Sequence, residues 1–125
     1  MQMLLAVAMG GALGAVSRHY VAGQILRMTG PGFPYGTMVV NILGSLLMGL
    51  MITAFAVKFE ASQELRGFLT VGLLGGFTTF STYSLETAML IERGDWTSAA
   101  LYAFGSMAVG LVALFAGIWL GRVLI

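Results

Sequence analysis

The stretch Gly75-Gly-Phe-Thr-Thr-Phe-Ser-Thr82 lies near the middle of the third of four apolar segments in this 125-residue chain. Glycine and hydroxyl-bearing residues weaken a helix, and at mid-bilayer depth they are tolerated only where the freed backbone groups find other partners. Those partners are protein, water or an ion. Because helices broken at this depth are typical of binding or permeation sites, the stretch predicts a broken third span. We expect its second half to begin near Phe80.

The whole chain has the composition of a membrane protein, with 58% hydrophobic and 9% charged residues. Crossing the hydrocarbon core of a bilayer takes about 20 apolar residues. Four windows reach this length, and they are Met3–Leu26, Gly36–Val57, Arg66–Ile91 and Trp96–Leu124. The connections between them are too short for a soluble domain. We therefore predict an all-α membrane protein in which residues 1–125 form one domain of four transmembrane helices.

Several classes of protein are excluded or disfavoured by what the chain lacks. It has no cysteine, which excludes disulfides and thiolate metal sites, and a net charge of only +1 gives no sign of a nucleic-acid partner. Met1–Leu13 has no basic start and its apolar run continues, so we expect no cleavable signal peptide. A lone His19 and a single intramembrane acid, Glu86, supply no nucleophile–base pair, so an enzyme is disfavoured.

The charges in the connections barely bias the orientation of the chain. If the N-terminus is cytoplasmic, three basic residues lie inside and two outside, namely Lys58, Arg66 and Arg122 against Arg27 and Arg93. The positive-inside rule gives almost no preference for such a count. Two interpretations stay open: one weakly favoured orientation, or insertion in both orientations with subunits that pair antiparallel.

Small residues recur at helical spacing in three of the spans. Such residues let helix backbones approach closely, which matters in lipid because the hydrophobic effect no longer drives helices together. The contacts are equally compatible with packing inside one subunit and with packing between subunits. The motifs are Gly10–Gly14, Ser45–Gly49 and Ala113–Gly117–Gly121. Asp95, just before the fourth span, is a candidate cap for that helix.

The first two spans each contain one notable polar group. The amide of Asn41 needs hydrogen-bond partners in hydrocarbon, so it either bonds to another helix or faces an ion path. Arg18 lies eight residues before Arg27, and its long side chain favours a snorkelling position or a structural salt bridge. His19 beside it favours an interfacial or packed position over a ligand role.

The third span carries the densest set of polar residues. Thr82 and Glu86 share one helix face, and Phe80 and Ser84 share the adjacent one. Glu86 either lines a pathway or reaches water at the membrane surface. Aromatic stripes usually mean packing, but hydroxyl groups are interleaved with Phe80 and Tyr83, which a packing face does not need.

Freed backbone at the break allows two kinds of ion site. Unwound carbonyls suit a hard cation such as sodium, while the N-terminal amides of the following half-helix create a positive potential. The edges of phenylalanine rings are also electropositive. Together these groups favour a small, strongly hydrated anion beside a cation. In the fourth span, Tyr102 and Ser106 are four residues apart and either bond to their own backbone or line a polar track.

These residues resemble the Fluc (CrcB) family of fluoride channels over essentially the whole chain. The resemblance rests on three strings, of which the last is highly specific: Gly10-Gly-Ala-Leu-Gly-Ala-Val-Ser-Arg-His-Tyr20, Gly36-Thr-Met-Val-Val-Asn41 and Gly75-Gly-Phe-Thr-Thr-Phe-Ser-Thr-Tyr-Ser-Leu-Glu86. It implies an antiparallel, dual-topology homodimer in the bacterial inner membrane that exports cytoplasmic fluoride passively through two pores. It also implies a central sodium ion, held by the main-chain carbonyls of Gly75 and Thr78 from both subunits.

The resemblance further assigns the pore residues. Asn41 matches the pore amide, and Phe80 and Tyr83 match a pair of phenylalanines that face fluoride. The remaining matches are polar positions along the pathway, namely Ser81, Thr82, Ser84, Glu86, Tyr102 and Ser106. Arg18 matches an arginine with a structural or vestibular role. The chain departs from the family at Tyr83, where phenylalanine is usual, and at Gly110, which lacks the hydroxyl often found there.

Two other membrane functions are weaker hypotheses. A proton-coupled multidrug exporter of the small four-helix type also inserts both ways, but it needs a titratable carboxylate deep in the first span. That span carries Arg18 and no acid. A structural or assembly protein without transport activity would leave the broken helix and its interleaved hydroxyl groups unexplained.

Overall fold

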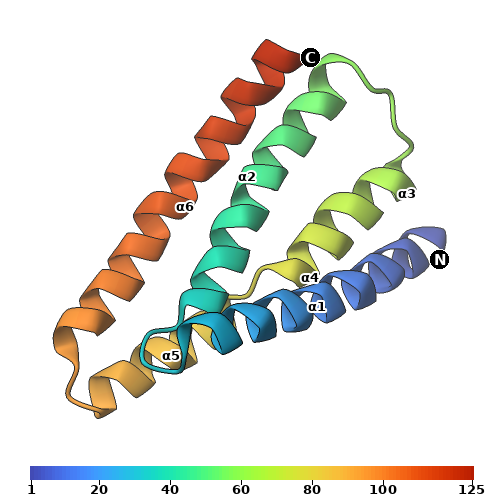
Figure 1. The fold of residues 1–125 in the computed structure, drawn as a ribbon. Helices are drawn as coiled ribbons and strands as arrows, with labels where there is room; N and C mark the ends of the chain where they lie inside the picture. Colours follow the sequence, from blue (N-terminus) through green and yellow to red (C-terminus); the bar gives the residue numbers. More distant parts are fainter.

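The computed structural model describes all residues, 1–125, and it is helical, without strands (Figure 1). Its three long helices are α1 (Gln2–Thr29), α2 (Tyr35–Val57) and α6 (Trp96–Leu124). At a rise of about 1.5 Å per residue, each exceeds the roughly 30 Å of a hydrocarbon core. All three are long and apolar enough to cross a membrane. The prediction of an all-α, multi-pass membrane protein is confirmed.

The predicted third span is not one continuous helix. Its first half consists of α3 (Gln63–Arg66), the π-helix η1 (Gly67–Leu74) and α4 (Gly75–Phe77), and its second half is α5 (Phe80–Glu92). Each half covers only about 20 Å at the α-helical rise, so neither half alone matches the bilayer. The two halves follow one another in roughly the same direction (Figure 1).

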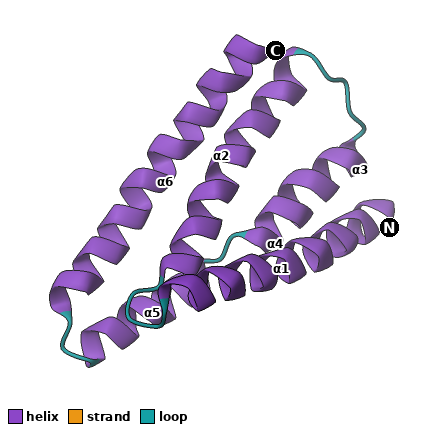
Figure 2. Ribbon diagram, viewed as in Figure 1, coloured by secondary structure: helices purple, strands orange, loops and turns teal.

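The break between these halves is confined to two residues. Thr78 and Thr79 have extended backbone, with φ of −90° and −150°, and they appear as a short loop between α4 and α5 (Figure 2). The sequence placed a break within Gly75–Thr82 and a new helix near Phe80, and both expectations are confirmed. The π-helical winding of η1 was not anticipated.

The helices lie in two pairs that share one end of the molecule. α2 lies beside α6, and α1 lies along η1 and α4 (Figure 1). Arg93, after α5, donates a hydrogen bond of 2.8 Å to the carbonyl of Gly32 between α1 and α2, and its other contact is a 3.3 Å ion pair with Asp95. The first and third connections therefore meet at the same end.

Both helix pairs pack backbone against backbone at glycine residues. A Cβ atom built on Gly14 of α1 would come within 2.8 Å of the Phe77 amide nitrogen, and one on Gly49 of α2 within 2.9 Å of the Ile118 nitrogen. Real Cβ atoms do not approach backbone so closely. The Gly10–Gly14 and Gly49–Gly117 positions therefore pack within a single subunit. The sequence alone was equally compatible with packing between subunits.

Asp95 caps α6, as the sequence suggested. Its carboxylate accepts a hydrogen bond of 3.2 Å from the Ser98 amide. Hydrogen bonds from Ser98, and to a lesser extent the nearby Arg93, hold the pKa of Asp95 below its usual value. Because the folded state favours the carboxylate, this contribution to stability is present above the usual pKa and is lost as the pH falls through the lowered one.

We expect Gly14→Ala to destabilise the protein by about 1–3 kcal/mol, because the added methyl group collides with the backbone of Leu73 and Phe77. Gly23→Ala in the same helix is the matched control, since nothing lies within 4 Å of its Cβ position. Thermal unfolding in detergent would compare them. Equal melting temperatures for the two variants would contradict the close packing of α1 against the broken segment.

Candidate functional site

The break is held open by the side chain of Asn41 on α2. Its Nδ2 donates to the carbonyl oxygen of Thr79 at 3.0 Å, and its Oδ1 accepts from the Thr79 amide at 2.8 Å. One amide side chain thus supplies both hydrogen bonds that an extended residue needs when it leaves the helix. The interhelical role that the sequence allowed for Asn41 is observed, and its partner is the break itself.

Two further contacts stabilise the break on either side. Arg18 of α1 donates from Nε to the carbonyl of Gly76 at 3.1 Å, before the break. The hydroxyl of Thr79 accepts from the Thr82 amide at 3.3 Å and so caps the start of α5. Arg18 forms no ion pair within the chain, and its observed partner is this carbonyl.

This arrangement frees two carbonyl groups in particular. In a continuous helix, Gly75 O would accept from the amide of Thr79, and Thr78 O from that of Thr82. Here the Thr79 amide bonds to Asn41, and the Thr82 amide bonds to a side-chain hydroxyl. Gly75 O and Thr78 O therefore lose the partners that an unbroken helix would provide.

A cavity of about 320 Å³ opens beside the break, and we call it the break cavity. Its lining mixes hydroxyl, amide and aromatic groups and includes no acidic residue. It receives side chains from α2, the break, α5 and α6. The lining residues are Asn41, Ser45, Thr78, Thr79, Phe80, Tyr83, Ser106 and Met107.

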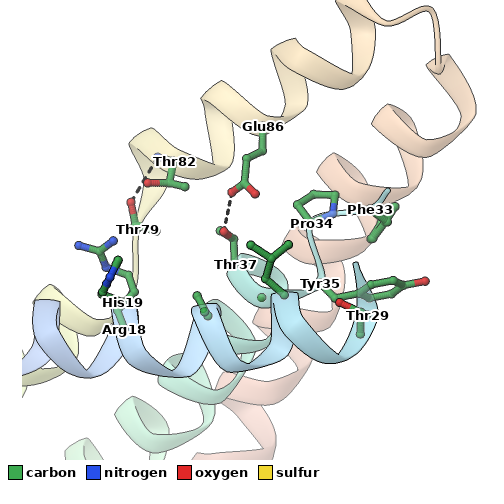
Figure 3. Close-up of a pocket in the computed structure, with 14 residues that line it drawn as sticks. Arg18, His19, Thr29, Phe33, Pro34, Tyr35, Thr37, Thr79, Thr82 and Glu86 are labelled. Atoms are coloured by element: carbon green, nitrogen blue, oxygen red, sulfur yellow. Dashed lines mark hydrogen bonds between the residues drawn. The ribbon is translucent and has the colours of Figure 1, made fainter. Parts of the chain in front are cut away.

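A second cavity, of about 280 Å³, also has Thr79 in its lining, and we call it the Arg18 cavity (Figure 3). Arg18, Thr82 and Glu86 all line it. Glu86 reaches across from α5 and accepts a hydrogen bond from the hydroxyl of Thr37 on α2 (Figure 3). Glu86 is partly buried and faces this cavity.

Aromatic rings pack against one another beside the break cavity. Tyr83 lies 5.6 Å from Phe80 and 5.3 Å from Tyr102, measured between ring centroids. The Tyr83 hydroxyl donates to the carbonyl of Ala103 on α6 at 2.6 Å, so its proton is not available to a ligand. The hydroxyl oxygen of Ser106 is buried and makes no hydrogen bond. The buried hydroxyl of Tyr102 lies beside Thr37 and Glu86. A buried hydroxyl without a partner is costly, which marks Ser106 as a candidate ligand-binding group.

The sequence matches the family model described as CrcB-like protein, Camphor Resistance (CrcB), over residues 5–118. The chain belongs to the CrcB-like family. A relative from Phenylobacterium zucineum is 54% identical over 98% of this chain and 97% of its own length, and its name is fluoride-specific ion channel FluC. Relatives from Nitrobacter winogradskyi and a Chelativorans species bear the same name at 50% and 48% identity, each over at least 96% of both chains.

In this CrcB-like chain, most of the residues singled out from the sequence come together. Asn41, Phe80, Tyr83 and Ser106 line the break cavity with Thr78. Arg18, Thr82 and Glu86 line the Arg18 cavity. Tyr102 is fully buried and packs against Tyr83. Ser81 and Ser84 are exposed on α5 and line neither cavity.

Thr37, Ser45 and Thr79 also line these cavities, and none of them was assigned a site role from the sequence. The sequence does contain a pattern that indicates the α2 positions. Thr37, Asn41 and Ser45 follow one another at intervals of four and form a polar stripe on one face of α2. This stripe faces the break and the Tyr102–Ser106 pair of α6. No group of three or more His, Cys, Asp or Glu side chains is placed to hold a metal ion, so a cation site here would depend on carbonyl oxygens.

We expect Asn41→Leu to loosen the break, because both the amide and the carbonyl of Thr79 lose their partners at a cost of about 2 kcal/mol. Hydrogen exchange measured by mass spectrometry should become faster in peptides that cover residues 77–85. Thr53→Val is the control on the same helix, since the Thr53 hydroxyl bonds only to its own helix at Gly49. Unchanged exchange in Asn41→Leu would show that the break does not depend on this pairing.

Proposed function

We propose that this protein is a fluoride-selective channel that lets cytoplasmic fluoride leave the cell by passive diffusion. The observation that carries the proposal is the break cavity, where amide, hydroxyl and aromatic groups line a space with no acidic side chain. The names of relatives about 50% identical over nearly their full length support fluoride as the ion. Residues 1–125 would act as one channel domain, and the protein would carry out transport rather than catalysis.

The chemistry of the break cavity suits a small anion. Fluoride is strongly hydrated, so a pore must offer several hydrogen-bond donors in exchange for water. Asn41 uses one of its two Nδ2 protons on Thr79 and retains the other. The hydroxyl of Ser106 is unpartnered, and α5 begins at Phe80 with free N-terminal amides and a positive dipole end. Phe80 adds the electropositive edge of its ring.

The proposed assembly is an antiparallel, dual-topology homodimer in the cell membrane with two pores. Support comes from the balanced charges of the connections and from the exposure of Phe80 (78%) beside the break, which leaves an apolar ring for a second copy to cover. Two breaks that meet would bring the freed carbonyls of Gly75 and Thr78 together in duplicate. Carbonyl oxygens suit sodium, which would neutralise these dipoles and join the subunits.

The Arg18 cavity would form one end of the pathway. Thr82 and Glu86 border it, and Thr79 lines both this cavity and the break cavity. Tyr102 and Ser106 would continue the polar lining along α6. Ser81 and Ser84, which point outward in a single chain, would take part only where a second copy of the chain covers them.

Liposomes loaded with fluoride or chloride test the proposed function directly. We expect the purified protein to release fluoride and to retain chloride, measured with ion-selective electrodes. Asn41→Asp should reduce fluoride release sharply, because a carboxylate replaces donors with a repulsive charge. Chloride release as fast as fluoride release would refute selectivity, and unchanged fluoride release in Asn41→Asp would remove Asn41 from the pathway.

We expect Tyr83→Phe to preserve fluoride release within about twofold and to lower stability by about 1 kcal/mol, because the lost hydroxyl binds the Ala103 carbonyl. The same liposome assay and a thermal melt would measure the two effects. A loss of fluoride release with unchanged stability would show instead that the phenol itself contacts the ion.

A further inference from the structure

The hydroxyl of Ser45 lines the break cavity but has no role in the pathway described so far. It lies on α2 one turn after Asn41, and its Oγ donates to the Asn41 carbonyl at 2.8 Å. Ser45 also lines a neighbouring cavity of about 220 Å³, which we call the α6 cavity. Asn41, Ser45, Ser106 and Met107 line both cavities, so these residues form the boundary between them.

The α6 cavity exists partly because residue 110 is glycine. Tyr102, Ser106 and Gly110 follow one another at intervals of four along α6, and the third position of this row has no side chain. A Cβ atom built on Gly110 has Ser45 Oγ, at 3.8 Å, as its one neighbour within 4 Å. The hydroxyl of Ser45 therefore faces the space that a side chain at position 110 would fill.

The burial of Ser106 gives an independent reason to place a ligand here. Its side chain is 7% exposed, its Oγ makes no hydrogen bond, and it lines both cavities. A buried hydroxyl that lacks a partner in an otherwise closely packed helix pair needs one from outside the chain. Ser45 offers a second hydroxyl to the same space from the opposite helix.

We propose that Ser45 binds the permeating anion where it passes between the break cavity and the α6 cavity, and that it supplies from α2 the hydroxyl that Gly110 cannot supply from α6. This inference rests on the proposed function. The Ser45 proton would leave the Asn41 carbonyl and turn to the ion. That carbonyl also accepts the helical hydrogen bond of α2, so it keeps one hydrogen-bond donor after the Ser45 hydroxyl turns away. A hydrogen bond to an ion is roughly twice as strong as one between neutral groups, which favours the exchange.

Two substitutions test this role: one removes the Ser45 hydroxyl from α2, and the other introduces a hydroxyl at position 110 of α6. In fluoride-loaded liposomes we expect Ser45→Ala to slow fluoride release about tenfold relative to the unchanged protein. Adding Gly110→Ser to this variant should restore release to within about twofold, because the new hydroxyl occupies the space that Ser45 faces. Adding Gly110→Ala instead fills the same space without a hydroxyl and should not restore it.

The outcomes separate this inference from the proposed function. Wild-type rates in Ser45→Ala, or equal rescue by Gly110→Ala and Gly110→Ser, would overturn the role of Ser45 and leave the channel in place. An unchanged protein that released no fluoride would overturn both. Size-exclusion profiles must match among the variants, and Ser45→Gly makes the same removal if Ser45→Ala does not fold.

Discussion

The pairing of the Asn41 side chain with the backbone of Thr79 is the interaction on which the rest of this structure depends. Unwinding a helix inside a membrane leaves peptide groups without water, and each unsatisfied group costs several kcal/mol. Asn41 satisfies both peptide groups of Thr79 with one amide, at 3.0 and 2.8 Å. The chain can therefore leave the helix for two residues and resume it at Phe80 without orphaned groups at Thr79.

The features of the site follow from that interruption. Since the Thr79 amide bonds to Asn41, the Gly75 carbonyl is released, and since Thr79 caps α5, the Thr78 carbonyl is released as well. The restart at Phe80 aims a helix N-terminus at the break and fixes which faces of α5 carry Thr82, Tyr83 and Glu86. Arg18 binds the carbonyl of Gly76, and its positive charge also lies beside the Arg18 cavity. One local break thus leaves freed carbonyl groups and free helix donors a few residues apart, and in the function we propose the first would bind a cation and the second an anion.

Much of this arrangement could be predicted from the sequence, because its causes are local. Hydropathy over about 20 residues located the long helices, and the weak helix formers at Gly75–Thr82 located the break. The partners of the break could not be predicted in the same way, since Asn41 and Arg18 are 38 and 58 residues away from the groups they bind. The outward direction of Ser81 and Ser84 depends on the residue at which α5 restarts. The polar stripe Thr37–Asn41–Ser45 was readable from spacing alone and was overlooked because only its middle member is an amide.

The central claim is that the break persists in the membrane and that its freed carbonyls and donors hold ions. A high-resolution structure of the protein in lipid nanodiscs, determined in sodium fluoride, tests it most directly. We expect that Asn41 stays paired with Thr79, that one cation density lies between the Gly75 and Thr78 carbonyls of two antiparallel copies, and that anion density lies in the break cavity. A helix that is continuous through Thr79, with its amide bonded to Gly75, would contradict this expectation.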